Sequence, residues 1–72
     1  MYGENSLEVG KEHRSIAGVE STRGEYRAAD SHYKKALKIF HDLGEQRLVR
    51  EVRLKMSALQ PYLTQGADYQ GK

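Results

Sequence analysis

The chain has 72 residues, a net charge of +2 at neutral pH and no Cys. This length allows one small domain with a thin core, which excludes an enzyme built around a deep cleft between domains. Without Cys there is no disulfide, no catalytic thiolate and no Cys-ligated zinc, which favours a reducing, cytoplasmic location. No apolar run exceeds two residues, so we expect no membrane insertion.

The two ends of the chain carry no periodic apolar pattern. Residues 1–6 and 64–72 consist largely of Gly and polar side chains. Such segments cannot bury enough apolar surface to become ordered, so both are predicted to be disordered tails. Residues 7–63 are therefore predicted to form the folded domain.

The first segment of this domain predicts a helix that begins near Leu7 and ends at Thr22. Ser6 can cap its start, because a Ser side chain accepts a hydrogen bond from a free amide of the first turn. Gly10 and Gly18 interrupt the segment, and each costs about 1 kcal/mol relative to Ala in a helix.

The second segment gives the strongest helical signal. Its apolar residues recur at spacings of three and four, which places them on one helix face. These residues are Tyr26, Ala29, Tyr33, Ala36, Leu37, Phe40 and Leu43. Gly44 follows them and is typical of the glycine that ends a helix in the left-handed conformation.

The third segment repeats this periodicity from residue 46 onward. Its apolar stripe consists of Leu48, Val52, Met56, Leu59 and Leu63. Pro61 has no backbone N–H and disfavours helix at the residue before it, so this helix is predicted to end near Leu59 or Gln60. No segment alternates apolar and polar residues for long enough to predict a strand. We predict an all-α, three-helix antiparallel unit.

A pattern of glycine, aromatic and alanine residues runs through the second segment. It consists of Gly24, Tyr26, Ala29, Tyr33 and Ala36. It resembles the second half of a tetratricopeptide repeat (TPR), in which the glycine permits a tight turn, the aromatic rings fill the gap between helices, and the alanines let the helices approach closely. Ala17 stands where the first helix of the repeat places a small residue. His13 and Glu20 stand where that helix normally carries large aromatic side chains.

The TPR resemblance covers residues 11–44 and implies a non-catalytic module for protein–protein interaction, an adaptor or scaffold. Because stacked repeats need about three units for stability, it also implies either a fragment of a longer array or a freestanding TPR-like helix pair with a third packing helix. A self-associating helical oligomer is a further alternative.

A second resemblance is to microtubule-interacting-and-transport (MIT) domains, which are three-helix bundles. It is carried by the step Tyr33, Ala36 and Leu37 and by residues 58–63. This resemblance implies that a partner helix binds in a groove beside the third helix. The expected contact residues are Val49, Arg53, Met56 and Gln60.

The sequence contains no constellation of residues suited to catalysis, a cofactor or a metal. His32 and His41 lie nine residues apart, which separates them by about 13.5 Å along a helix and prevents them from sharing a metal ion. No Gly-rich phosphate loop and no nucleophile flanked by glycines is present. We expect neither an enzyme nor a cofactor or metal site.

Two sets of residues are candidates for partner binding. The first lies where TPRs that grip a carboxylate carry basic and Asn side chains, and it consists of Lys11, Arg14, Ser15 and Gly18. The second is a row of arginines spaced three residues apart in the third segment: Arg47, Arg50 and Arg53.

The arginine row has two main interpretations. The simpler one is a solvated face whose charges are paired with Glu51 and with the acidic first segment. The other is a surface for an acidic protein or peptide. A nucleic acid is not expected, because a net charge of +2 is small for a protein that binds phosphate backbones.

Overall fold

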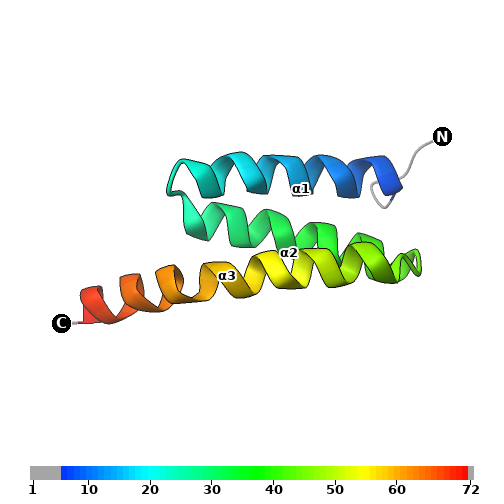
Figure 1. Cartoon of the computed structure of the whole chain (residues 1–72). Coiled ribbons are helices and arrows are strands. Elements are labelled where there is room, and N and C mark those ends of the chain that lie inside the picture. The colour runs from blue at the N-terminus through cyan, green and yellow to red at the C-terminus, as the bar shows by residue number, and fades with distance from the viewer. Residues whose placement is uncertain (1–5, 72) are drawn as a thin grey trace.

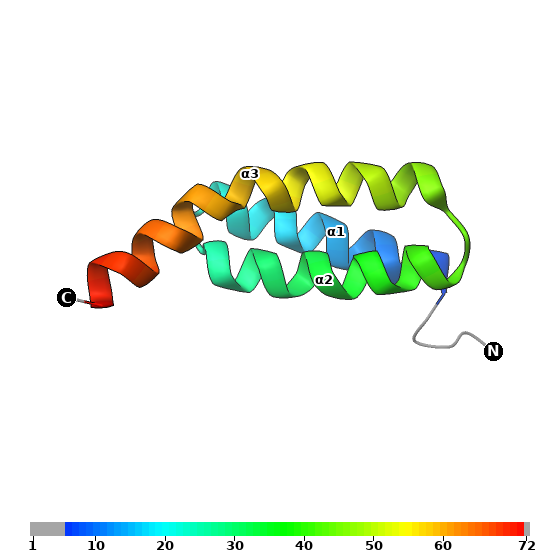
Figure 2. The same cartoon turned by 90° about the horizontal axis from the view of Figure 1, so that it is seen from below.

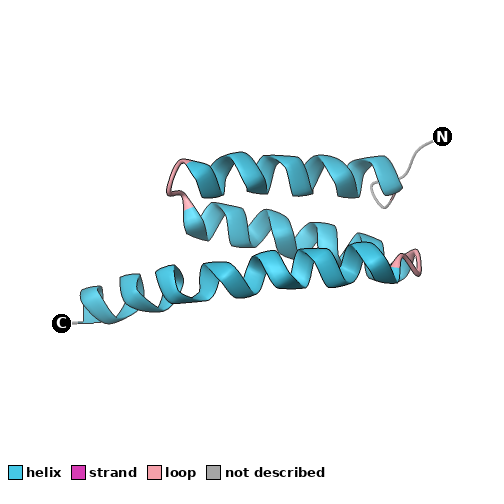
Figure 3. Ribbon diagram, in the orientation of Figure 1, coloured by secondary structure: helices cyan, strands magenta, loops and turns pink. Residues whose placement is uncertain are grey.

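Within residues 6–71, the backbone forms three helices joined by two short turns (Figures 1 and 3). The computed structural model describes the side chains of residues 6–63, and residues 1–5 and 72 lie outside the described part. The helices are α1 (Leu7–Thr22), α2 (Tyr26–Asp42) and α3 (Gln46–Gly71). Consecutive helices run in opposite directions, so the predicted all-α, three-helix antiparallel unit is confirmed.

Helix α2 supplies most of the core. It packs against both α1 and α3, which makes it the central element of the bundle (Figures 1 and 2). Five of the eight buried apolar side chains of the described residues belong to α2. The eight are Ala17, Ala29, Tyr33, Ala36, Ile39, Phe40, Val52 and Leu59. The stripe predicted for α2 is confirmed except in two places: Leu43 is 46% exposed, and Ile39, which the stripe did not include, is buried.

The helix ends follow from local hydrogen bonding, as predicted. Ser6 Oγ accepts a hydrogen bond from the amide of Val9 at 3.2 Å, which caps the start of α1. Gly24 and Gly44 have φ of 84° and 76°. After Gly44, the amide of Glu45 donates to the carbonyl of Phe40 at 2.9 Å. That bond closes a Schellman motif, which requires the left-handed glycine.

Helix α3 does not end before Pro61, and the prediction of an end near Leu59 or Gln60 is wrong. The helix continues to Gly71, and its axis bends where the ribbon changes from yellow to orange in Figure 2. The ring of Tyr62 stacks on that of Tyr26, with 4.4 Å between centroids and 10° between planes. Leu59 is buried, so packing on α2 holds α3 on both sides of Pro61 and offsets the lost hydrogen bond.

Of the two segments predicted to be tails, the structure describes only one at any length. The N-terminal one, residues 1–6, lies outside the described residues except for the capping Ser6. For the C-terminal one, residues 64–72, the backbone of residues 64–71 continues α3 as helix. Over residues 6–71, no helix combines the length and the apolar character that a bilayer crossing requires.

At Gly10, α1 lies against the side chains of Ile39 and Phe40 of α2. A Cβ atom at Gly10 would lie 2.7 Å from Cε1 of Phe40 and 3.0 Å from Cγ2 of Ile39. Distances this short cannot be tolerated without a shift of the surrounding side chains. The glycine that weakens the helical pattern of the sequence therefore allows α1 to sit directly on the core.

Candidate functional site

The arginine row lies on the first half of α3, and all three side chains are exposed. Within residues 6–63, none of Arg47, Arg50 and Arg53 forms an ion pair. Glu51, the acid that the simpler interpretation assigned to the row, pairs instead with Arg14 of α1, with Nη1 and Oε1 3.1 Å apart. The row is therefore positive charge that the described part of the chain leaves without a counter-ion.

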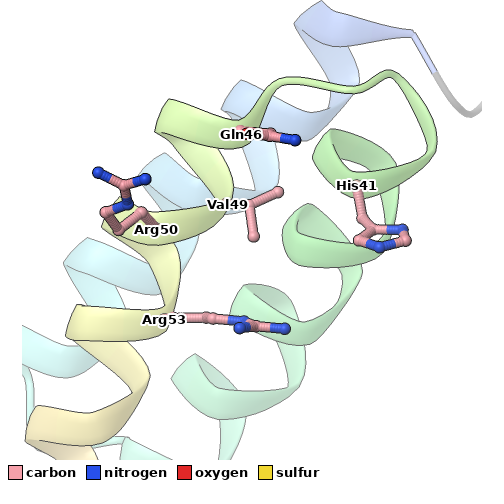
Figure 4. Close-up of a pocket in the computed structure, with 5 residues that line it drawn as sticks. All are labelled: His41, Gln46, Val49, Arg50 and Arg53. Carbon is pink, nitrogen blue, oxygen red and sulfur yellow. The ribbon is translucent and has the colours of Figure 1, made fainter.

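A hollow of about 290 Å³ lies beside this row, between the end of α2 and the start of α3. It is lined by His41, Gln46, Val49, Arg50 and Arg53. Figure 4 shows Gln46, Val49 and Arg53 extending from α3 toward α2, whereas the guanidinium of Arg50 points away from α2. His41 reaches the hollow from α2. Two basic side chains, Arg53 and His41, thus enclose an apolar floor formed by Val49.

The lining of the hollow contains no acidic residue. Three acids adjoin the lining residues in sequence: Asp42, Glu45 and Glu51. Glu51 pairs with Arg14, and Glu45 forms no ion pair within residues 6–63. Oδ2 of Asp42 lies 3.6 Å from Nζ of Lys38, and its Oδ1 lies 4.0 Å from Nδ1 of His41. Lys38 is therefore the cation that pairs with Asp42. Guanidinium, amide and imidazole groups around an apolar floor suit an anionic group carried on an aliphatic stem.

The structure divides the candidate set on α1, which consists of Lys11, Arg14, Ser15 and Gly18. Lys11 and Ser15 are exposed and, with Glu12 and Ile16, line a shallow hollow of about 520 Å³. Arg14 is half-buried and turns to α3, where it pairs with Glu51. Gly18 is also half-buried. Lys11 and Ser15 share a surface, whereas Arg14 ties α1 to α3.

A polar cluster between α1 and α2 is the main feature that the sequence did not reveal. Nδ1 of His32 lies 2.8 Å from Oε1 of Glu20 and 3.2 Å from the carbonyl oxygen of Ala28. Both neighbours are acceptors, so Nδ1 of His32 carries a hydrogen and donates it. The ring of His13 stacks on that of His32, with centroids 5.5 Å apart.

The stacked ring of His13 completes this cluster. Nδ1 of His13 is buried and has no hydrogen-bond partner within residues 6–63. The described residues contain no group of three or more His, Asp or Glu side chains placed to hold a metal ion. One signal could have pointed to the cluster: His13 and Glu20 occupy positions where the TPR pattern has large aromatic residues, and His32 completes the filling of that gap from α2.

The three helices also meet around Tyr33. Tyr33 belongs to α2, and its side chain is buried. Burial is the main reason why the pKa of its hydroxyl group lies above the usual value. The carboxylate of Glu51 raises that pKa further, and the guanidinium of Arg14 lowers it. The interhelix ion pair therefore acts electrostatically on a core residue.

Comparison with protein-family models, with curated proteins and with solved structures found no match to this chain. The TPR and MIT resemblances rest on the residue patterns alone.

Proposed function

We propose that this chain is a non-catalytic protein-interaction module of TPR-like type, an adaptor or scaffold that binds an acidic segment of another protein through the arginine row of α3. The observation that carries the proposal is the exposure of three arginines with no ion pair to the described residues. Glu51 lies beside them on α3 but is engaged by Arg14. We propose a cytoplasmic location because the chain contains no Cys.

The TPR-like assignment is supported by the roles that its pattern residues play. Gly24 takes the left-handed conformation at the turn. Ala29 and Ala36 are fully buried, and Tyr33 is nearly so. In a TPR helix pair, a glycine likewise forms the turn, small residues let the helices pack closely, and an aromatic ring fills the space between them.

An acidic protein is favoured over a nucleic acid by the scale of the basic surface. The row occupies part of one helix, in a chain whose net charge is only +2. Binding to a phosphate backbone draws its free energy from the release of counterions by many basic contacts. A short acidic segment needs only a few arginines, which bind carboxylates through paired hydrogen bonds.

The test is binding of a short fluorescein-labelled Glu-rich peptide to the whole chain, measured by fluorescence anisotropy, with a Gln-rich peptide of equal length as the reference. We expect binding of the Glu-rich peptide that weakens steeply with added salt, because exposed charges are screened. The triple variant R47E/R50E/R53E should abolish it.

A matched triple variant, R23E/R27E/K35E, controls for net charge, because it exchanges three other exposed cations for the same change in charge. It should retain most of the binding. Equal loss in the two variants would show diffuse attraction instead of a surface on α3. Equal binding of the Glu-rich and Gln-rich peptides would refute the proposed function.

Self-association is a second candidate, favoured by Leu54 of α3, whose side chain is 68% exposed. Sedimentation equilibrium over a range of concentrations decides it, because the apparent mass and the thermal stability of an oligomer both rise with concentration. The MIT-like groove would instead give binding of a helical peptide that depends little on salt.

A further inference from the structure

We propose that the hollow between α2 and α3 binds one carboxylate of the acidic partner, held between Arg53 and His41. This inference rests on the proposed function, and it locates the specificity for the acidic partner at the hollow. Of the three arginines in the row, it singles out Arg53 as the one that contacts the anchoring group.

The spacing along α3 explains why Arg53 differs from its neighbours. Gln46, Val49 and Arg53 are separated by three and four residues, so they lie on one face of the helix. That face looks toward α2 and its His41 (Figure 4). Arg50 lies one residue beyond Val49, and its guanidinium points away from α2. Two identical charges three residues apart therefore face different surroundings.

The lining favours a carboxylate on an aliphatic stem over a bare anion. Val49 is half-buried at the floor and offers apolar contact to a methylene group. The guanidinium of Arg53 and the side-chain amide of Gln46 are hydrogen-bond donors suited to carboxylate oxygens. At about 290 Å³, the hollow has the size of the smallest ligand pockets, which suits one side chain of a bound segment and not a docked helix.

Charge complementarity argues for an acidic occupant. The residues of the lining are basic, amide or apolar. Of the acids next to them in sequence, Asp42 lies within ion-pair distance of Lys38, Glu51 pairs with Arg14, and Glu45 is not part of the lining. Arg47 lies outside the hollow, and Arg50 lines it with its guanidinium pointing away from α2. Both would raise the local concentration of an acidic segment without choosing its register.

The experiment compares three variants that remove the same charge from the same helix: R47Q, R50Q and R53Q. The affinity of each variant for the labelled Glu-rich peptide is measured at one fixed ionic strength. Circular dichroism checks that each variant retains its helix content. We expect R53Q to weaken binding about tenfold, the loss of one charge-assisted hydrogen bond. R47Q and R50Q should each weaken it less than about threefold, as exposed charges do. H41L should weaken binding more than either of them.

The outcomes separate the two proposals. Equal effects of the three glutamine variants would overturn the anchoring role of Arg53 and leave the acidic-partner function standing. No preference of the wild-type chain for the Glu-rich peptide would refute the function itself. A single-stranded oligonucleotide that binds more tightly than the Glu-rich peptide and displaces it would overturn the carboxylate assignment in favour of phosphate.

Discussion

The imidazole rings of His13 and His32 stack across the interface between α1 and α2, with 5.5 Å between their centroids and 28° between their planes. His32 also donates to Glu20, whose side chain is only 17% exposed. His32 and Glu20 satisfy each other's hydrogen bonding, whereas His13 contributes ring stacking alone. The cluster therefore joins α1 to α2 outside the apolar core.

Replacement of His32 by Ala tests the cluster. We expect H32A to lower the free energy of unfolding by about 1–3 kcal/mol, because the half-buried carboxylate of Glu20 loses its donor and His13 loses its stacking partner. Urea denaturation followed by circular dichroism measures the change.

The matched control is His41, whose side chain is 74% exposed. H41A should change the free energy of unfolding by less than about 0.5 kcal/mol. Equal effects of H32A and H41A would mean that the cluster does not contribute to stability.

Two glycines of α1 provide an internally controlled test of the helix packing. In an open helix, Gly→Ala stabilises by about 1 kcal/mol. Gly18 meets this condition, since a Cβ there would have no neighbour within 4 Å, so G18A should raise the free energy of unfolding. At Gly10 the added Cβ meets Phe40 at 2.7 Å, and overpacking should make G10A destabilising by about 1–3 kcal/mol. Chemical denaturation of both variants would show opposite signs; two stabilising changes would contradict the close approach of α1 to α2.

We predict that the free energy of unfolding decreases at alkaline pH because of Tyr33. Its pKa is raised in the folded state, chiefly by burial, above the ordinary value of 10.0. As the pH rises through 10, the unfolded chain releases the phenolic proton before the folded chain does. The stability contribution is therefore complete below pH 10 and is lost between that value and the folded-state pKa.

The measurement is the free energy of unfolding against pH, from neutral to alkaline, for the wild type and two variants. Y33F removes the titrating hydroxyl and should show a smaller alkaline loss than the wild type. Y62F changes a half-exposed ring and should retain the wild-type profile. Identical profiles for Y33F and Y62F would contradict the assignment of the loss to Tyr33.

The helices and much of the core could be predicted because they depend on contacts between residues close in sequence. The cap at Ser6, the tight turn at Gly24 and the left-handed glycine at position 44 each involve residues within one or two helical turns. The apolar stripe of α2 repeats at spacings of three and four residues. The predicted end of α3 before Pro61 is wrong because it, too, was based on local hydrogen bonding alone. The missing N–H of Pro61 favours a helix end at this position. The packing of Leu59 and Tyr62 on α2 stabilises the helix on both sides of Pro61, so α3 continues.

The candidate site was predicted only in part: its arginines and Val49 were named as contact residues from the sequence, whereas Gln46 and His41 were not. The arginine row and its exposure follow from spacing, whereas its lack of a counter-ion depends on Arg14, which is 37 residues from Glu51 in sequence. The hollow beside Arg53 likewise requires the end of α2 to lie next to the start of α3. The sequence by itself determined which residues form helices and which helix face is apolar, since both are set by local periodicity and capping. Only the tertiary structure decided which glycine is a contact point, which acid pairs with Arg14, and which arginine faces His41. Those relations depend on the relative placement of helices, which periodicity within each segment leaves open.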